Sequence, residues 1–208
     1  MRILPSIGMI KYCLVVIISL SALDSFAQQF KDLGCAEKLW VFCHPFSAFK
    51  AKRITLEVKN TVDSVAAQKV WPKIESGGIK DAFRHGLWMA MLSSRIGYRK
   101  AIWLGKAHEK KNKIDFKKSK LEEGALPDLR SVQMDLYNNK VAGELGKVCK
   151  KCSSADLVIL VLEKIEGGEF QVIKMDEKGN SLDSMGLIIE KKDWMGKWEN
   201  NRVLVPSH

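Results

Sequence analysis

Helical periodicity over most of the chain is the feature that most constrains its fold. Apolar residues recur at helical spacing, between Gly and Pro breaks, over about residues 50–70, 81–95, 98–110, 128–148 and 156–165. Beyond residue 167 the pattern alternates instead, over 170–175 and again from 187, around a turn at 176–180. The sequence therefore predicts a mainly α, compact multi-helix domain with a small C-terminal β-hairpin at about residues 167–191.

A stripe of short or absent side chains marks the predicted helix over 128–148. The stripe consists of Asp135, Asn139, Gly143 and Gly146. It allows a second helix to approach closely and presents a carboxylate and a carboxamide to that neighbour. Gly86 and Ala90 leave similar room on the helix over 81–95, so we expect these two helices to pack together.

The amino-terminal region has the three parts of a secretory signal peptide. A basic start with Arg2 and Lys11 precedes an apolar run from Cys13 to Leu23, and the small residues of Ser25-Phe26-Ala27 suit cleavage. We predict a signal peptide over 1–27, cleaved near Ala27, and a single helical domain over 28–208 that is secreted or periplasmic. An uncleaved membrane anchor is the alternative. No cysteine directly follows the apolar run, which disfavours a lipoprotein.

Four cysteines remain after this leader, an even number that favours disulfides in an oxidising compartment. Their spacing predicts local bridges from Cys35 to Cys43 and from Cys149 to Cys152. A crossed pairing stays open, because connectivity does not follow from sequence. A four-cysteine zinc site is the competing interpretation, but the first pair is spaced too loosely for a zinc knuckle.

The chain is basic, with a formal net charge of +10, and part of this charge is concentrated. The stretch from Lys106 to Lys120 holds seven lysines against Glu109 and Asp115. Outside the cytoplasm the available polyanions are lipid headgroups and envelope polymers, so we expect an anionic lipid or envelope polymer, and no nucleic acid, as its partner. A solvated mobile loop is the simpler interpretation of the same lysines.

Polar residues that can do chemistry fall in three short segments. These are DAFRH at 81–85, AHE at 107–109 and MDLYNNKVAG at 134–143. In the first segment Asp81 and His85 are four residues apart and share a helix face, and Arg84 and Trp88 lie together beside them. An aspartate four residues before a histidine fixes the tautomer of the imidazole and raises its basicity.

One chemistry that fits these segments uses a divalent metal, the candidate cofactor. His85, His108 and Asp135 would form a two-histidine, one-carboxylate site that activates water, with Glu109 as general base.

The other chemistry needs no metal. His85 would deprotonate water, Asp135 or Asp81 would orient its ring, and Arg84 would stabilise the developing anion. A structural alternative is that these residues, with Asn139, form a buried polar network that links three helices. A further alternative is a site that binds a ligand without turnover. The sequence contains no GxSxG, HExxH or phosphate-loop motif, which disfavours the enzyme classes that use them.

Taken together, DAFRHGLWMAMLSSRIG, AHE and MDLYNNKVAGELG resemble a largely uncharacterised bacterial domain family. Its members share AFRHxxW, AHE and MDLxNNxxG motifs, and some look like modules of secreted or toxin-like proteins. The resemblance covers about residues 81–146 and supplies no reaction. It implies that the motif positions here are Arg84, His85, Trp88, His108, Glu109, Asp135, Asn138, Asn139 and Gly143.

A looser likeness is to bacterial secreted phospholipase A2 enzymes, in which an Arg-His pair on one helix faces an aspartate on another. Gly86 stands here where that family has a calcium-binding aspartate.

From these observations we expect a secreted or envelope hydrolase with lipids among its candidate substrates. His85, Asp135, His108, Glu109 and Arg84 are its candidate catalytic residues. The residues expected to contact a ligand are Asp81, Trp88, Asn138 and Asn139. The alternative function is a non-catalytic envelope binding or structural module.

Overall fold

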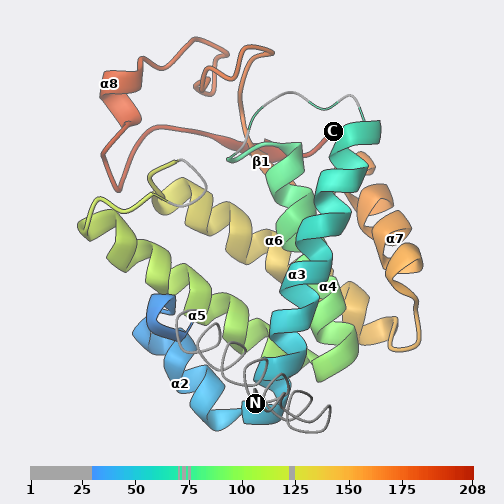
Figure 1. The fold of residues 1–208 in the computed structure, drawn as a ribbon. Coiled ribbons are helices and arrows are strands. Elements are labelled where there is room, and N and C mark those ends of the chain that lie inside the picture. The colour runs from blue at the N-terminus through green and yellow to red at the C-terminus, as the bar shows by residue number, and fades with distance from the viewer. Residues whose placement is uncertain (1–29, 70, 72–73, 75, 122–124) are drawn as a thin grey trace, which may run out of the picture.

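The protein is seen in a computed structural model that describes residues 30–69, 71, 74, 76–121 and 125–208. The predicted signal peptide lies outside the described residues. Figure 1 shows a bundle of helices with an extended C-terminal segment at one end. The bundle consists of α2 (Cys35–Cys43), α3 (Pro45–Gln68), α4 (Ile79–Ile96), α5 (Tyr98–Lys117), α6 (Leu129–Val148) and α7 (Ser154–Glu166). The C-terminal segment contributes β1 (Gln171–Ile173), α8 (Lys191–Trp194) and β2 (Leu204–Pro206).

The predicted fold class is confirmed: the chain is a compact multi-helix domain with a small antiparallel sheet near its C-terminus. None of the helices among the described residues combines the length and hydropathy that a membrane span requires.

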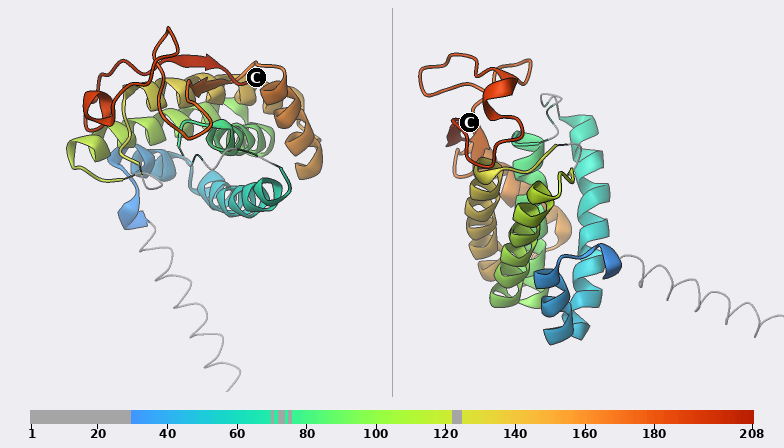
Figure 2. Two further views of the ribbon diagram at one scale, coloured as in Figure 1. Left: turned by 90° about the horizontal axis from the view of Figure 1, so that it is seen from above. Right: turned by 90° about the vertical axis from the view of Figure 1, so that its left-hand side faces the viewer.

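Helix α4 lies at the centre of the bundle and contacts α3, α5, α6 and α7. Figure 2, seen from above, shows it enclosed by these neighbours. Its apolar side chains are buried on every side, which explains why its hydrophobic pattern is nearly continuous from 86 to 92. Because α4 carries the DAFRH segment at its first turns, the polar residues of that segment enter a packed interior.

The predicted contact between α4 and α6 is present, and Gly146 is the position that permits it. A Cβ atom on Gly146 would lie 2.1 Å from the carbonyl oxygen of Ala90. Gly143 instead meets α5, where Tyr98 and Ile102 cover it. Gly86 faces away from α6: a Cβ there would lie 2.3 Å from the ring of Phe170, which is fully buried just after α7.

Helix α5 is longer than expected and includes most of the lysine-rich stretch, which is therefore not a loop. The helix continues to Lys117 because its inward face beyond residue 110 is polar: Asn112 and Asp115 are buried. Lys111 also pairs with Asp115 one turn further along. Apolar periodicity does not reveal a helix turn whose inward face is polar, so the end of this helix was predicted near residue 110.

The C-terminal sheet pairs β1 with β2 in antiparallel register, with Val172 opposite Val205. The first strand falls where the alternating pattern predicted it. Its partner is not the segment from 187, which forms only an isolated bridge between Leu182 and Ile188. After β1 the chain passes through α8 and only then forms β2, which pairs with β1. The predicted turn at 176–180 is flanked only by an isolated bridge between Met175 and Ser181.

One predicted disulfide is present and the other is wrong. Cys149 and Cys152 are bonded in the turn between α6 and α7. Cys35 and Cys43 are free and exposed at the two ends of α2. Eight helical residues separate two Cα atoms by about 12 Å, whereas a disulfide requires less than about 7 Å. This arrangement also rules out the crossed pairing and the four-cysteine zinc site.

Candidate functional site

Asp81, Arg84 and His85 form a linked polar cluster at the start of α4. The backbone N–H of Gly77 donates to Asp81 Oδ2 at 2.6 Å, which fixes the carboxylate at the amino end of the helix. Arg84 Nη2 donates to the other carboxylate oxygen, Oδ1, at 2.5 Å. His85 Nε2 lies 3.5 Å from that same oxygen. Asp81 and His85 therefore lie together as predicted, and Arg84 joins them. The predicted rise in the basicity of His85 is wrong, because its pKa is lowered.

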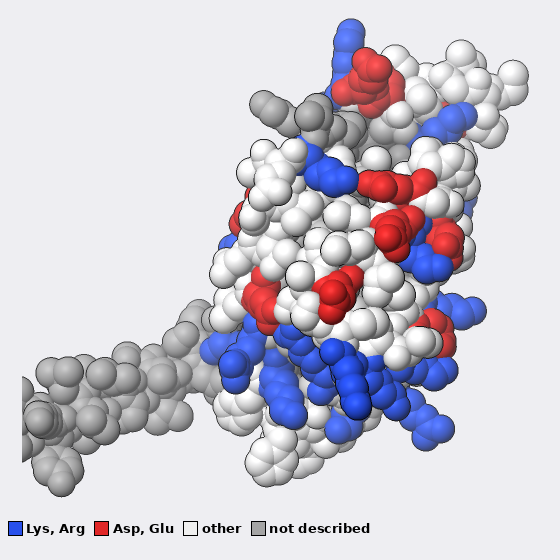
Figure 3. Space-filling model, turned by 90° about the vertical axis from the view of Figure 1, so that its right-hand side faces the viewer, with Lys and Arg blue, Asp and Glu red and all other residues white. Residues whose placement is uncertain are grey.

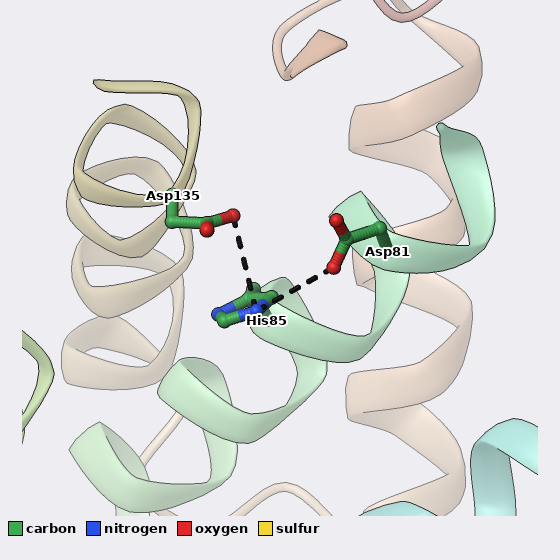
Figure 4. Close-up of side chains that lie close together, drawn as sticks. All are labelled: Asp81, His85 and Asp135. Atoms are coloured by element: carbon green, nitrogen blue, oxygen red, sulfur yellow. Dashed lines mark ion pairs between the residues drawn. The ribbon is translucent and has the colours of Figure 1, made fainter. Parts of the chain in front are cut away.

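Asp135 approaches this cluster from α6. Its Oδ1 atom lies 3.9 Å from His85 Nε2, and Figure 4 shows that the carboxylates of Asp81 and Asp135 both approach this same ring nitrogen. All three side chains are buried. The close approach of α6 to α4 at Gly146 brings the aspartate within reach, so the stripe on α6 positions a functional group as well as permitting packing.

The imidazole of His85 is held in its neutral form. Burial lowers its pKa well below the usual value near 6.5, and the positive charge of Arg84 and the neighbouring His108 lower it further. Arg84 Nη2 lies 3.0 Å from His85 Nε2, and a guanidinium only donates, so Nε2 accepts this hydrogen bond. The proton then resides on Nδ1, which is buried and has no hydrogen-bond partner among the described residues.

The cluster has the ligand types for a metal ion, although not in the predicted set. Ligand atoms of Asp81, His85 and Asp135 all lie within 4.8 Å of one another. His108 does not belong to this group, because Asp81 takes the place predicted for it. The guanidinium of Arg84 already contacts two of the three ligands, so a cation bound here would have to displace it. The positive charge beside these ligand atoms is therefore that of the Arg84 guanidinium.

A second pair, which the sequence analysis missed, joins His108 to Glu37. His108 Nδ1 lies 3.0 Å from Glu37 Oε1, and the N–H of Gly34 donates to Glu37 Oε2 at 2.7 Å. Glu37 is buried, whereas the side chain of His108 is 27% exposed. A buried carboxylate on one imidazole nitrogen orients the ring and fixes its tautomer. Sequence spacing does not reveal the pair, because α2 and α5 are far apart in the chain.

Both histidines line one large cleft. It has a volume of about 880 Å³ and runs between α3 on one side and α2, α4 and α5 on the others. The rings of His85 and His108 lie 6.2 Å apart between centroids, and the ring of Trp88 lies 5.8 Å from that of His108. Trp88 Nε1 also donates to Thr55 Oγ1 on α3, at 3.0 Å. His85 of the DAFRH segment and His108 of the AHE segment therefore lie on the same cleft.

The lining of this cleft is mainly apolar. The apolar lining includes Leu33, Trp40, Val41, Ala48, Leu56, Val58, Val62 and Leu104. The lining also contains Lys52, Lys59 and Lys80. On the far side of His85, a cavity of about 10 Å³ is lined by Asp81, Ser131 and Asp135, among others. This second space matches one water molecule, so His85 separates a water-sized polar cavity from a large apolar cleft.

Glu109 and Asn139 lie away from the cleft. Glu109 is buried and accepts a hydrogen bond from Asn112 at 3.1 Å. It stands one turn after Gly105, whose Cβ position meets the amide of Asn139 on α6. Consecutive helical residues point about 100° apart, so Glu109 faces α6 while His108 faces the cleft. Glu109, predicted as the general base of a metal site, therefore lies away from the cleft, and the carboxylate that contacts His108 is that of Glu37.

Asn138, another expected ligand contact, binds the C-terminal segment instead. Its Nδ2 donates to the carbonyl of Gln171 at 2.9 Å, and its Oδ1 accepts from the N–H of Gln171 at 2.8 Å. This reciprocal pair attaches the first residue of β1 to α6. Asn138 is therefore a structural residue.

Comparison with known proteins gives one match. A family model described as a domain of unknown function (DUF6973) matches residues 38–169, which include α3 to α7 and both histidines of the cleft. No curated protein and no solved structure matches the chain.

Proposed function

This chain belongs to the DUF6973 family of domains of unknown function, and we propose that it is a secreted or envelope hydrolase that cleaves acyl esters of lipids. The observation that carries the proposal is the cleft of about 880 Å³, with the His108–Glu37 pair and His85 on its walls. Imidazole paired with a buried carboxylate is a common arrangement for general-base catalysis. The resemblance of its motifs to those of secreted and toxin-like proteins agrees with a substrate outside the producing cell.

The cleft suits an amphipathic substrate. Its volume falls in the range of about 300–1,000 Å³ that is typical of ligand sites, and its apolar walls can bury an acyl chain. Lys52 and Lys59 lie about two helical turns apart on α3 and line the same cleft. They can bind an anionic headgroup while their alkyl stems pack along the apolar wall.

His108 is the proposed general base. Glu37 accepts the Nδ1 proton of the ring, so Nε2 is the nitrogen that removes a proton from water. The water oxygen attacks the ester carbonyl carbon, and the C–O bond to the alcohol then breaks. The departing oxygen takes the proton back from His108, which releases a fatty acid and an alcohol and restores the neutral ring.

The cluster around His85 serves to stabilise charge in this mechanism. Arg84 carries a permanent positive charge beside the cleft, and Asp81 and His85 hold its guanidinium in place. A fixed cation stabilises the negative oxygen of the tetrahedral intermediate. His85, neutral and acting as an acceptor for Arg84, is then a positioning residue rather than the base.

The test is ester hydrolysis by the purified protein, measured with acyl esters of increasing chain length. We expect turnover to rise with chain length and to fall by about 100-fold or more in His108→Gln and by about tenfold or more in Glu37→Gln. Glu144→Gln is the matched control, because Glu144 is an exposed carboxylate paired with Lys147 outside the cleft. Absence of turnover in the wild type, or full turnover in His108→Gln, would contradict the proposal.

Elemental analysis of the same protein preparations distinguishes a metal-dependent reaction from the metal-free one. A bound divalent metal that is lost in His85→Ala would assign Asp81, His85 and Asp135 as its ligands. Full ester turnover in the presence of a chelator would instead support the metal-free route.

A binding function without turnover is the second candidate. The ion pair between Arg84 and Asp81 favours this candidate, because two charges that neutralise each other suit a structural role as well as a catalytic one. Mass spectrometry of the purified protein after incubation with a phospholipid distinguishes the two functions. Intact lipid that stays bound indicates a carrier, whereas release of fatty acid indicates the hydrolase.

A further inference from the structure

One end of the bundle carries two phenylalanines that point into solvent. Phe42 and Phe46 lie on either side of the corner between α2 and α3 and are 83% and 85% exposed. Water contact with a whole phenylalanine side chain is unfavourable, and each would gain free energy by entering an apolar phase. Two such residues at one corner therefore mark a surface that has a partner.

The corner is held rigidly. Trp40 is buried beneath it, and its Nε1 atom donates to the carbonyl of Lys100 at the start of α5, at 2.9 Å. The ring of His44, at the corner itself, packs against Trp40 and Trp103 with centroids 5.2 and 5.0 Å away. The phenylalanines are thus presented by a fixed scaffold and not by a loose loop.

Basic side chains gather at the same end of the bundle as this corner. Figure 3 shows Lys and Arg gathered over the lower end of the molecule, where in Figure 1 α3 and α7 begin and α4 and α6 end. Exposed basic residues at this end are Lys50, Arg53, Arg99, Lys100, Lys147, Lys150 and Lys151. Lys100 Nζ reaches Ser47 Oγ on α3, at 3.2 Å, which places the start of α5 directly beside the corner.

The same corner adjoins the mouth of the cleft. Val41 and Ala48, each one or two residues from an exposed phenylalanine, line the cleft, and Lys52 and Leu56 continue its lining along α3. The lining of the cleft therefore begins within one or two residues of each exposed phenylalanine.

We propose that this end of the bundle docks on an anionic lipid bilayer, with Phe42 and Phe46 inserted at the level of the headgroups and the basic residues facing anionic lipids. Apolar insertion and charge attraction together are the combination that gives stable interfacial binding. The docking surface is distinct from the lysine-rich stretch of α5, which extends toward the opposite end of the bundle. Docking stands by itself, while delivery of lipid from the bilayer into the cleft rests on the proposed function.

Vesicle flotation tests the docking. The full-length protein, purified as its host produces it, is mixed with two kinds of phosphatidylcholine vesicles. One kind contains no phosphatidylglycerol, and in the other about one-third of the lipid is phosphatidylglycerol. We expect binding to the anionic vesicles and weakening by salt. Phe42→Ser with Phe46→Ser should lower the partition coefficient by at least about tenfold. The matched control is Met185→Ser with Leu187→Ser, two similarly exposed apolar residues on the C-terminal segment.

Charge reversal tests which basic surface faces the lipid. Lys150→Glu with Lys151→Glu alters the docking end, and Lys117→Glu with Lys118→Glu alters the end of α5 by the same net charge. The first double variant should lose at least about tenfold in binding to anionic vesicles and the second should lose much less. Equal losses, or unchanged binding in Phe42→Ser with Phe46→Ser, would overturn the proposal. A phenylalanine-dependent dimer in solution without vesicle binding would also overturn it.

Hydrolysis of a short, water-soluble ester separates docking from the proposed function. If the double phenylalanine variant hydrolyses the soluble ester normally but loses activity on vesicles, both proposals stand. If no ester is hydrolysed while vesicle binding still depends on the phenylalanines, docking stands and the hydrolase proposal fails. If the variant attacks vesicle lipid as fast as the wild type, docking fails and the hydrolase proposal stands.

Discussion

Gly146 and Gly143 lie three residues apart on α6, and alanine at each tests how closely α6 must approach α4. Both substitutions gain about 1 kcal/mol of helix propensity. They differ in what the added methyl group meets. At Gly146 it meets the carbonyl oxygen of Ala90 at 2.1 Å and Ser93 Cβ at 2.9 Å, while at Gly143 it meets Ile102 Cδ1 at 2.9 Å.

The energetic consequence follows from which of these neighbours can move. Ile102 can shift the end of its side chain, so we expect Gly143→Ala to stay within about 1 kcal/mol of the wild type. The carbonyl of Ala90 belongs to the backbone of α4, so the two helices must separate by about 1 Å to restore van der Waals contact. Overpacking of this kind costs about 1–3 kcal/mol or more, and we expect Gly146→Ala to lose about 2 kcal/mol net of propensity.

Urea unfolding followed by circular dichroism measures the free energy of unfolding of both variants under one set of conditions. The difference between them should be about 2 kcal/mol, with Gly146→Ala the less stable. A difference below about 0.5 kcal/mol, or the opposite order, would refute the reasoning. Because the same helix contact places Asp135 beside His85, Gly146→Ala should also weaken any activity that depends on this pair, whereas Gly143→Ala should not.

Three further results are expected. His85 binds a proton near pH 6.5 in the unfolded chain but not in the folded chain, because folding lowers its pKa. The free energy of unfolding measured in urea should therefore fall as the pH drops through about 6.5, and it should fall less steeply in His85→Gln. Asn138→Ala should lose about 1–3 kcal/mol, with faster hydrogen exchange at the amide of Gln171, and unchanged exchange there would contradict the pairing. Cys35 and Cys43 should react with a thiol reagent in the native protein, whereas the cysteines between α6 and α7 should react only after reduction.

The helical fold was accessible from the sequence because amphipathic periodicity records which helix face is buried. Periodicity does not identify a helix turn whose inward face is polar, and at the end of α5 the polar residues Asn112 and Asp115 occupy core positions. The predicted bridge between Cys35 and Cys43 is wrong because an even cysteine count does not show whether both residues lie in one helix. The second strand was misplaced because pairing with residues 204–206 depends on long-range contacts.

The candidate site was predictable in part for a similar reason. Asp81 and His85 are one turn apart, so local spacing alone placed them together, and the small residues of α6 correctly brought Asp135 to them. Glu37 could not be found in this way, because its partner His108 is reached only through the packing of α2 on α5. Glu109, the predicted general base, is a chain neighbour of His108, but it faces α6 and not the cleft.

The packing of Phe170 against Gly86 bears on where this domain ends. The family match stops at residue 169, one position before a side chain that is fully buried against the central helix. A truncated protein cut at that boundary would leave a hollow beside the DAFRH segment and would also lose the strand that Asn138 holds. Expression of residues 38–169 alone is therefore expected to yield an unstable fragment, and recombinant versions for biochemical work should extend through β2.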